Sequence, residues 1–261
     1  MNELGAAMSA RDKGGLSANA LKAIAIIAMV LDHVAKLFLP QTSLLFSIFK
    51  CVGRITGPTM FFFIAEGYHR TSNVNRYTLR LGIFALVSYF PYLFAFYSSG
   101  SFIPTSANYM HFNVIYTLFL GHLALRARHE VKNPLASWAI VALLLGLAVT
   151  ADWNYISILF ILAFDYFYGD FKKQAFAYSL LTILYIMPRV SYPMSAILNG
   201  VPVDFTRATQ YLYYFGMFIP IFLLSRYNGN LGKGGKFAKW SFYIIYPGHL
   251  LVLGIIIHFL L

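Results

Sequence analysis

The feature that most constrains the fold of this chain is a series of long apolar segments joined by short polar connections. A transmembrane helix needs about 20 mostly apolar residues, and by that measure the sequence holds about nine candidate spans. They lie at roughly 21–39, 44–66, 79–97, 109–125, 136–151, 153–168, 174–189, 209–225 and 241–260. We therefore predict an all-α fold, a polytopic bundle of transmembrane helices.

The composition excludes the common soluble classes of protein. Of the 261 residues, 59% are hydrophobic and only 11% are charged, against about 25% charged in an average soluble domain. The same composition also excludes a disordered, a collagen-like and a disulfide-rich chain. The single Cys51 cannot form an intramolecular disulfide, so cysteine usage says nothing about the compartment.

The basic residues are distributed by side of the membrane. Lys and Arg number 20 against 9 Asp and Glu, a net charge of +11. With the N-terminus in the cytoplasm, the positive-inside rule places these basic residues in cytoplasmic segments: Arg11, Lys13, Lys22, Arg70, Arg76, Arg80, Arg126, Arg128, Lys132, Lys172, Lys173, Arg226, Lys233, Lys236 and Lys239. The remaining ones are Lys36, Lys50, Arg54, Arg189 and Arg207. The charge therefore indicates topology and not nucleic-acid binding.

The alternation predicts an odd number of spans, with the C-terminus outside. Residues 1–20 form a cytoplasmic tail in this interpretation, and residues 1–261 form one domain, because no internal repeat or Pro/Gly-rich linker is present. Two outer connections are predicted, Tyr97–Tyr109 and Pro188–Thr209. Loops of this length are often lids or binding elements, although ordinary exposed loops remain an alternative.

Four ionisable residues from three spans are predicted to lie at one depth. His33 comes eleven residues after Lys22, about 16 Å into a core about 30 Å thick, and Asp32 is its neighbour. Arg54 and His249 each lie about 15 Å deep in their own spans. Because charges at this depth are costly, they indicate function, with Asp32 pairing with Arg54. A structural ion pair with two core histidines is the alternative.

Helix-breaking residues surround Arg54. The segment Gly53-Arg54-Ile55-Thr56-Gly57-Pro58 predicts a broken helix, a feature that lines cavities at membrane depth. Near the cytoplasmic ends lies a second polar set, for which structural roles are equally plausible: Glu66, Arg80, His122 and Asp165. No Walker A loop, HExxH or CxxC motif occurs, so no metal is predicted.

Three stretches of the sequence resemble the TraX family, which is named for the protein that N-acetylates F-type pilin. The first stretch is Leu21-Lys22 with Asp32-His33. The second comprises Gly53-Arg54, Pro58, Phe61, Phe63, Glu66-Gly67, Tyr77, Arg80-Leu81, Ser88 and Pro91. The third is Tyr246-Pro247-Gly248-His249-Leu250. In layout the chain is also similar to membrane acyltransferases that modify surface polysaccharides.

The resemblance implies an acyltransferase of the bacterial inner membrane that takes acetyl from acetyl-CoA. His33 becomes the general base, with Asp32 and Arg54 in the same site, His249 as a second candidate base, and Glu66 at a motif position. The acceptor is a pilin-like peptide amine or a hydroxyl of a surface glycan or lipid.

The chemistry of the residues is compatible with this reading. A histidine can deprotonate the acceptor and Arg54 can stabilise an oxyanion. The CoA phosphates are expected to bind basic cytoplasmic residues: Arg70, Arg76, Arg80, Lys236 and Lys239. Besides acyl-CoA and the acceptor, membrane lipids are the expected partners. A transporter or channel, or a non-catalytic assembly protein of a pilus or conjugation system, remains the alternative.

Overall fold

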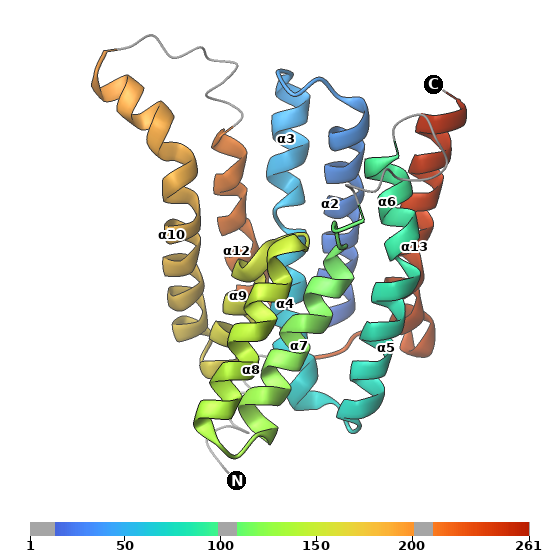
Figure 1. Ribbon diagram of the computed structural model, residues 1–261, viewed down its shortest axis with the longest axis vertical. Helices are drawn as coiled ribbons and strands as arrows, with labels where there is room; N and C mark the ends of the chain where they lie inside the picture. Colours follow the sequence, from blue (N-terminus) through green and yellow to red (C-terminus); the bar gives the residue numbers. More distant parts are fainter. Residues whose placement is uncertain (1–13, 99–108, 201–210, 261) are drawn as a thin grey trace. The chain divides into compact units, whose positions relative to one another are not determined.

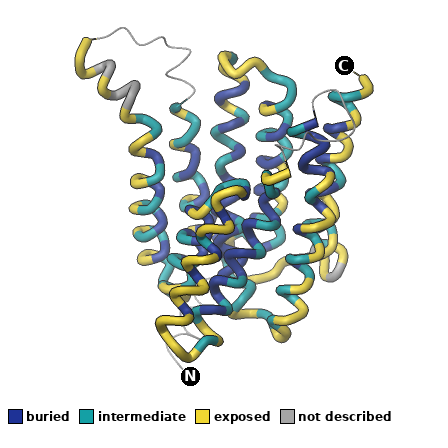
Figure 2. The backbone as a smooth tube through the Cα atoms, in the orientation of Figure 1, coloured by how far each residue is buried: buried dark blue, intermediate teal, exposed yellow. Residues whose placement is uncertain are grey.

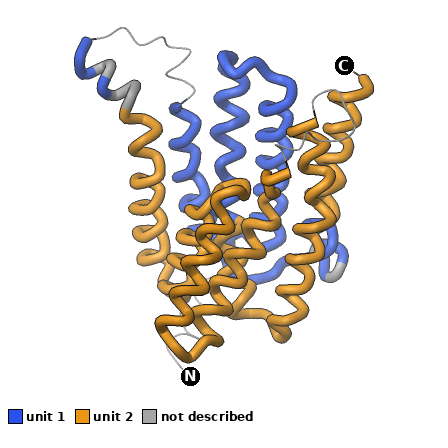
Figure 3. The backbone as a smooth tube through the Cα atoms, viewed as in Figure 1, with its two compact units in different colours: residues 1–59, 192–242 blue, residues 60–191, 243–261 orange. Residues whose placement is uncertain are grey.

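The computed structural model describes residues 14–98, 109–200 and 211–260, and within these ranges the regular secondary structure is helical, with two isolated β-bridges (Figure 1). The prediction of an all-α chain is therefore confirmed. Figure 2 shows buried and exposed residues alternating around most of these helices. The chain divides into two compact units, residues 1–59 with 192–242 and residues 60–191 with 243–261 (Figure 3).

The helices are assigned to the units as follows. Unit 1 contains α2 (Ala18–Phe38), α3 (Leu44–Gly53), η3 (Tyr213–Phe218) and α12 (Ile219–Ser225). Unit 2 contains α5 (Val74–Val87), α6 (Tyr89–Tyr97), α7 (Val114–Glu130), α8 (Pro134–Leu147), η2 (Ala148–Thr150) and α9 (Asn154–Tyr166). Three helices run from one unit into the other, namely α4 (Thr56–Arg70), α10 (Phe171–Leu198) and α13 (Gly235–Phe259).

Within the described part of the chain, three helical stretches are long and apolar enough to cross a membrane. They are Leu44–Arg70, Val74–Tyr97 and Trp240–Phe259. Their outward faces are apolar as well: Leu79, Ile83 and Leu86 of α5 recur at helical spacing and are all exposed. Such a surface is unfavourable in water and suited to hydrocarbon, which suggests a membrane protein.

The predicted break in the second span is confirmed. α3 ends at Gly53, Arg54 and Ile55 form a turn, and α4 begins at Thr56. The Thr56 hydroxyl donates to the carbonyl of Ala25 in α2 at 2.9 Å, so the restart of the helix is anchored. The third predicted span is also two helices, α5 and α6, which meet at the buried Ser88.

Two helix ends differ from the predicted ones. The fourth span was expected to end at residue 125, but α7 runs on to Glu130, because Arg126 pairs with Glu130 one turn later and so remains in the helix. The outer connection expected from Pro188 is helical as far as Leu198, where α10 ends. Asp204 and Arg207 of that connection, and residues 99–108 of the other one, lie outside the described residues.

The helices α8 and α9 are shorter than the predicted spans 136–151 and 153–168. They have 14 and 13 residues, about 20 Å each, whereas the hydrocarbon core is about 30 Å thick. Their connecting turn is held by the segment before α7, since Phe112 N–H donates to Thr150 O at 3.1 Å and Asp152 N–H to Phe112 O at 2.9 Å. Because a two-helix hairpin returns to its starting side, the predicted alternation does not depend on how deep this pair reaches.

The core of unit 2 forms where α7 packs against α8 and α9. The residues buried there are Leu120, Ala124, Ala127, Val141, Leu144, Ala148 and Ile158. Gly121 of α7 has to be small, because a Cβ at this position would collide with the side chain of Ile161 on α9. This close packing brings the C-terminal ends of α7 and α9 to the same end of the unit.

Unit 1 is built around α2. The N–H groups of the first turn of this helix have no partner within the helix and donate to the segment before α13. Ala18 N–H donates to Asn230 O at 2.8 Å, and Asn19 N–H donates to Leu231 O at 3.0 Å. The Ser17 hydroxyl accepts from Ala20 N–H and caps the helix. α3 packs along α2, and η3 packs against α3.

Candidate functional site

A group of charged side chains lies between α2 and α3 of unit 1. Lys50 Nζ is 2.8 Å from Asp32 Oδ1, and Arg54 Nη2 is 3.8 Å from the same oxygen. All three side chains are mostly buried, with exposed fractions of 10%, 18% and 15% for Lys50, Asp32 and Arg54. The predicted pairing of Asp32 with Arg54 is therefore present, but the shorter contact is to Lys50, which was not predicted as a site residue.

Close packing of the two helices brings these charges together. Gly53 of α3 faces Asp32 so closely that a Cβ at residue 53 would collide with its side chain. The glycine predicted as part of a helix break is thus also needed for the approach of α3 to α2. Any larger residue would push the carboxylate away from its cations.

The guanidinium of Arg54 lies over aromatic rings of η3. Its Cζ is 5.1 Å from the ring centroid of Tyr213 and 5.5 Å from that of Tyr214. Cation–π contacts of this kind orient an arginine without neutralising its charge. An arginine fixed in this way could stabilise a negative charge. The two tyrosines were not predicted as part of the site, because the prediction rested on ionisable residues at one depth.

His33 follows Asp32 on α2 and is buried, with 8% of its surface exposed. We call Asp32, His33, Lys50 and Arg54 the Asp32 cluster. Within it two basic side chains face one carboxylate, and a titratable imidazole is adjacent in the chain. The arrangement has the parts for proton abstraction beside an anion-stabilising group.

His249, the fourth residue predicted at this depth, belongs to unit 2. It lies on α13, where its Nδ1 is 2.8 Å from Ile245 O one turn earlier, and its ring is 5.6 Å from that of Tyr246. One ring nitrogen is therefore within hydrogen-bond distance of its own helix. The prediction that His249 joins the Asp32 cluster stays a prediction.

Glu66 is buried near the end of α4 in unit 2. Its Oε1 is 2.7 Å from Arg70 Nε one turn later, and Tyr168 of the segment after α9 hydrogen-bonds with both side chains. Because Arg70 already pairs with a carboxylate, its predicted contact with a CoA phosphate would have to compete with that pair. Glu66 therefore has an evident structural partner, and its predicted catalytic role stays a prediction.

The other basic residues predicted to hold CoA belong to both units. Arg76 is exposed on the first turn of α5, and Arg80 lies one turn later with its Cζ 5.6 Å from the Tyr77 ring. Lys236 and Lys239 are on the first turns of α13, and their side chains lie outside what the structure describes. The predicted contact of these residues with the CoA phosphates stays a prediction.

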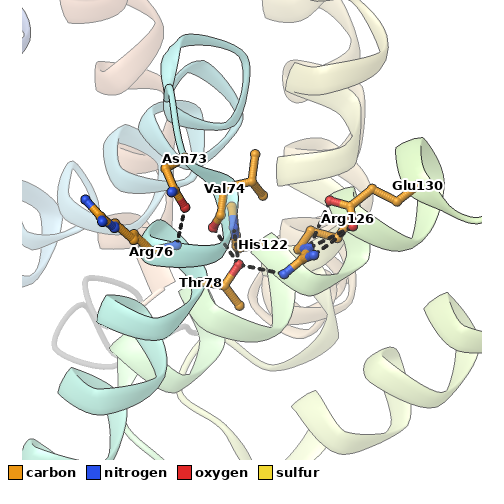
Figure 4. A network of polar contacts seen from close by, with 7 residues as sticks. All are labelled: Asn73, Val74, Arg76, Thr78, His122, Arg126 and Glu130. Atoms are coloured by element: carbon orange, nitrogen blue, oxygen red, sulfur yellow. Dashed lines mark hydrogen bonds and ion pairs between the residues drawn. The ribbon is translucent and has the colours of Figure 1, made fainter.

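His122 of α7 belongs to a bonded polar network with α5 (Figure 4). Thr78 Oγ1 donates to Val74 O at 2.9 Å, lies 3.0 Å from His122 Nε2 and accepts from Arg126 Nη1 at 3.2 Å. Since the hydroxyl has only one hydrogen, His122 Nε2 must be the donor to it. The network holds α5 to α7, so the structural reading of His122 is favoured.

Two comparisons with known proteins cover most of the chain. The model of a family described as TraX protein matches residues 17–257, a range that includes the whole Asp32 cluster. A probable fimbrial assembly protein FimC, serogroup H1, of Dichelobacter nodosus is 32% identical over 246 residues, which make up 91% of this chain and 94% of that protein. No solved structure matches the chain.

Proposed function

Because the chain belongs to the TraX family, we propose that it is an integral-membrane acyltransferase whose reaction takes place at the Asp32 cluster. The acyl group is acetyl, taken from acetyl-CoA. The acceptor is the N-terminal amine of a pilin-like peptide. The fimbrial assembly relative supports an acceptor of this class.

In the proposed reaction His33 acts as the general base. It removes a proton from the attacking amine as nitrogen bonds to the thioester carbonyl carbon. The carbonyl oxygen becomes an oxyanion, and Arg54 stabilises this charge while the tyrosines of η3 hold the guanidinium in place. Collapse of the intermediate expels the CoA thiolate, which takes up the proton from His33 and leaves an amide.

Lys50 and Asp32 set the net charge of this site. The Asp32 carboxylate partly neutralises two buried cations, which lowers the cost of keeping them there. One positive charge remains in excess within the Asp32 cluster. That excess favours an anionic intermediate over a neutral ground state, which is the direction that catalysis requires.

The observation that carries the proposal is that Lys50 and Arg54 share one mostly buried carboxylate, Asp32, between α2 and α3, and that the buried His33 is the next residue of α2. A purely structural ion pair would need only one cation for the one carboxylate, whereas Asp32 faces two. Transport remains the competing function, since broken helices and buried charges also occur in transporters. The break at Arg54 fits both functions, and the reaction itself distinguishes them.

The direct experiment is acyl transfer by the purified chain in detergent. It is incubated with acetyl-CoA labelled in the acetyl group and a peptide with a free N-terminal amine. We expect label in the peptide, and none in the same peptide with its terminus blocked in advance. A chain that moves label only into lipid or glycan would keep the reaction class and change the acceptor, whereas a chain that neither binds nor turns over acetyl-CoA would end the enzyme proposal.

A further inference from the structure

Two histidines and one aspartate of unit 2 lie within contact distance of one another. Asp165 Oδ1 is 2.7 Å from His69 Nε2, and Asp165 Oδ2 is 2.9 Å from His129 Nε2. One ligand atom from each residue fits within 4.8 Å of the other two. We call His69, His129 and Asp165 the Asp165 cluster, and we propose that it is a binding site for a divalent transition-metal ion, with zinc as the expected ion.

The donor set and its spacing match zinc. Two imidazole nitrogens and one carboxylate oxygen, with water in the fourth position, form a common zinc coordination sphere. Bonds of about 2.0–2.1 Å in a tetrahedron place neighbouring ligand atoms about 3.3 Å apart. Each nitrogen–oxygen pair has to separate by roughly 0.5 Å to admit the ion, a change that side-chain rotation can provide. Each imidazole binds as the neutral ring with its hydrogen on Nδ1.

The backbone independently favours a cation at this point. His69, His129 and Asp165 are each the second-last residue of a helix, α4, α7 and α9 respectively. The C-terminal end of a helix carries a partial negative charge of about half an elementary charge. Three such ends meet at the Asp165 carboxylate, and their partial negative charges add to that of the carboxylate in favouring a cation there.

Aromatic rings hold both imidazoles. Tyr168 stacks on His69 with 3.9 Å between ring centroids, and Tyr68 stacks on His129 at 5.0 Å. Fixed imidazoles lose little freedom when a metal binds, which favours affinity. Tyr168 also hydrogen-bonds with Glu66 and Arg70, so the aromatic support of His69 is itself anchored.

The exposure of the ligands leaves room for a fourth one. The Asp165 side chain is 9% exposed, whereas those of His69 and His129 are 25% and 40% exposed. The carboxylate therefore lies at the bottom of the site and the imidazoles are open to solvent. A metal with three protein ligands and one exchangeable position can bind water or a substrate oxygen.

Metal binding can be measured without any acyl substrate, so the test is independent of the proposed transfer reaction. The full chain, purified in detergent with a tag that contains no histidine, is stripped with a chelator and then titrated with Zn²⁺ against a competing indicator. Titration with Co²⁺ adds the visible absorption of a tetrahedral complex. We expect about one equivalent of metal per chain, and a higher unfolding temperature when metal is present.

Variants then locate the site. In His129→Gln and Asp165→Asn the affinity for zinc should fall by more than about 100-fold, since even groups that only support a metal ligand are worth 10–100-fold. His111→Ala removes a histidine that stacks on Tyr97 elsewhere in unit 2, and it should bind as the wild type does. Wild type that takes up no zinc, or variants that bind it equally well, would overturn the proposal. A wild type without the tetrahedral cobalt spectrum would overturn the proposal whether or not the variants fold.

Discussion

Lys50 of α3 lies closer to Asp32 of α2 than Arg54 does, at 2.8 Å against 3.8 Å. The two cations are four residues apart and share one face of the chain as α3 ends. Asp32 is thus the counter-ion that Lys50 and Arg54 share. Its removal would leave two buried positive charges facing each other, and this dependence can be tested.

Asp32→Asn should strongly destabilise the protein. Removing one partner of a buried ion pair costs about 3–5 kcal/mol, because the remaining charge is uncompensated. Thermal unfolding in detergent measures the loss. The double variant Asp32→Asn with Lys50→Met should recover part of it, since one of the two stranded cations is then gone. If Asp32→Asn unfolds at the wild-type temperature, the ion pair is not a buried structural element.

Gly53→Ala should disturb the same pair by steric means. The new Cβ collides with the Asp32 side chain, and overpacking of this kind costs about 1–3 kcal/mol. Gly146→Ala in α8 is the matched control, because a Cβ there meets nothing within 4 Å. It should stabilise the chain by up to about 1 kcal/mol through helix propensity. Equal effects of the two substitutions on the unfolding temperature would contradict the close approach of α3 to α2.

Thr78→Val should weaken the contact between α5 and α7. The hydroxyl that joins His122 and Arg126 is lost while the shape of the side chain is kept. Leaving buried donors unpaired costs about 1–3 kcal/mol, measured as a lower free energy of unfolding. Thr150→Val is the matched control and should be nearly neutral, because this exposed hydroxyl donates to Leu147 O of its own turn. A Thr78 variant that is as stable as this control would count against the network.

The predicted topology can be tested with single cysteines. Cys51 is the only cysteine of the chain, so a Cys51→Ser background accepts new ones. Asn199→Cys should react with a membrane-impermeant thiol reagent in intact cells. Lys132→Cys, between α7 and α8, should react only after the cells are broken, because the positive-inside rule puts it in the cytoplasm. Labelling of both in intact cells, or the reverse order, would refute the orientation.

Depth counting predicted the meeting of Asp32 and Arg54 because Asp32 lies in α2 and Arg54 directly follows the last residue of α3, and each residue of a helix adds a fixed rise. The same counting missed Lys50, although its position four residues before Arg54 places it on the same helix face. The cation–π contacts of Arg54 could not be predicted, since Tyr213 and Tyr214 are far away in the sequence. Those contacts depend on how α3 and η3 pack.

The Asp165 cluster shows the same limit. Asp165 lies 96 residues from His69 and 36 from His129, so no short motif connects them. The fourth span was also predicted to end at residue 125, before His129, whereas α7 runs to Glu130. The turn between α8 and α9 was predicted at the right place, between the spans 136–151 and 153–168, although α8 and α9 themselves are a few residues shorter than these spans.

The measurement that tests the central proposal most directly is the transfer rate of His33→Ala beside wild type and His111→Ala. The readout is labelled acetyl moved from acetyl-CoA to the peptide amine by purified protein in detergent. We expect wild type and His111→Ala to transfer at the same rate, and His33→Ala to lose about 10²–10⁴-fold in kcat, as expected for a missing general base. Full activity of His33→Ala would contradict the role of His33, and the lack of any transfer, hydrolysis or binding of acetyl-CoA by wild type would contradict the function itself.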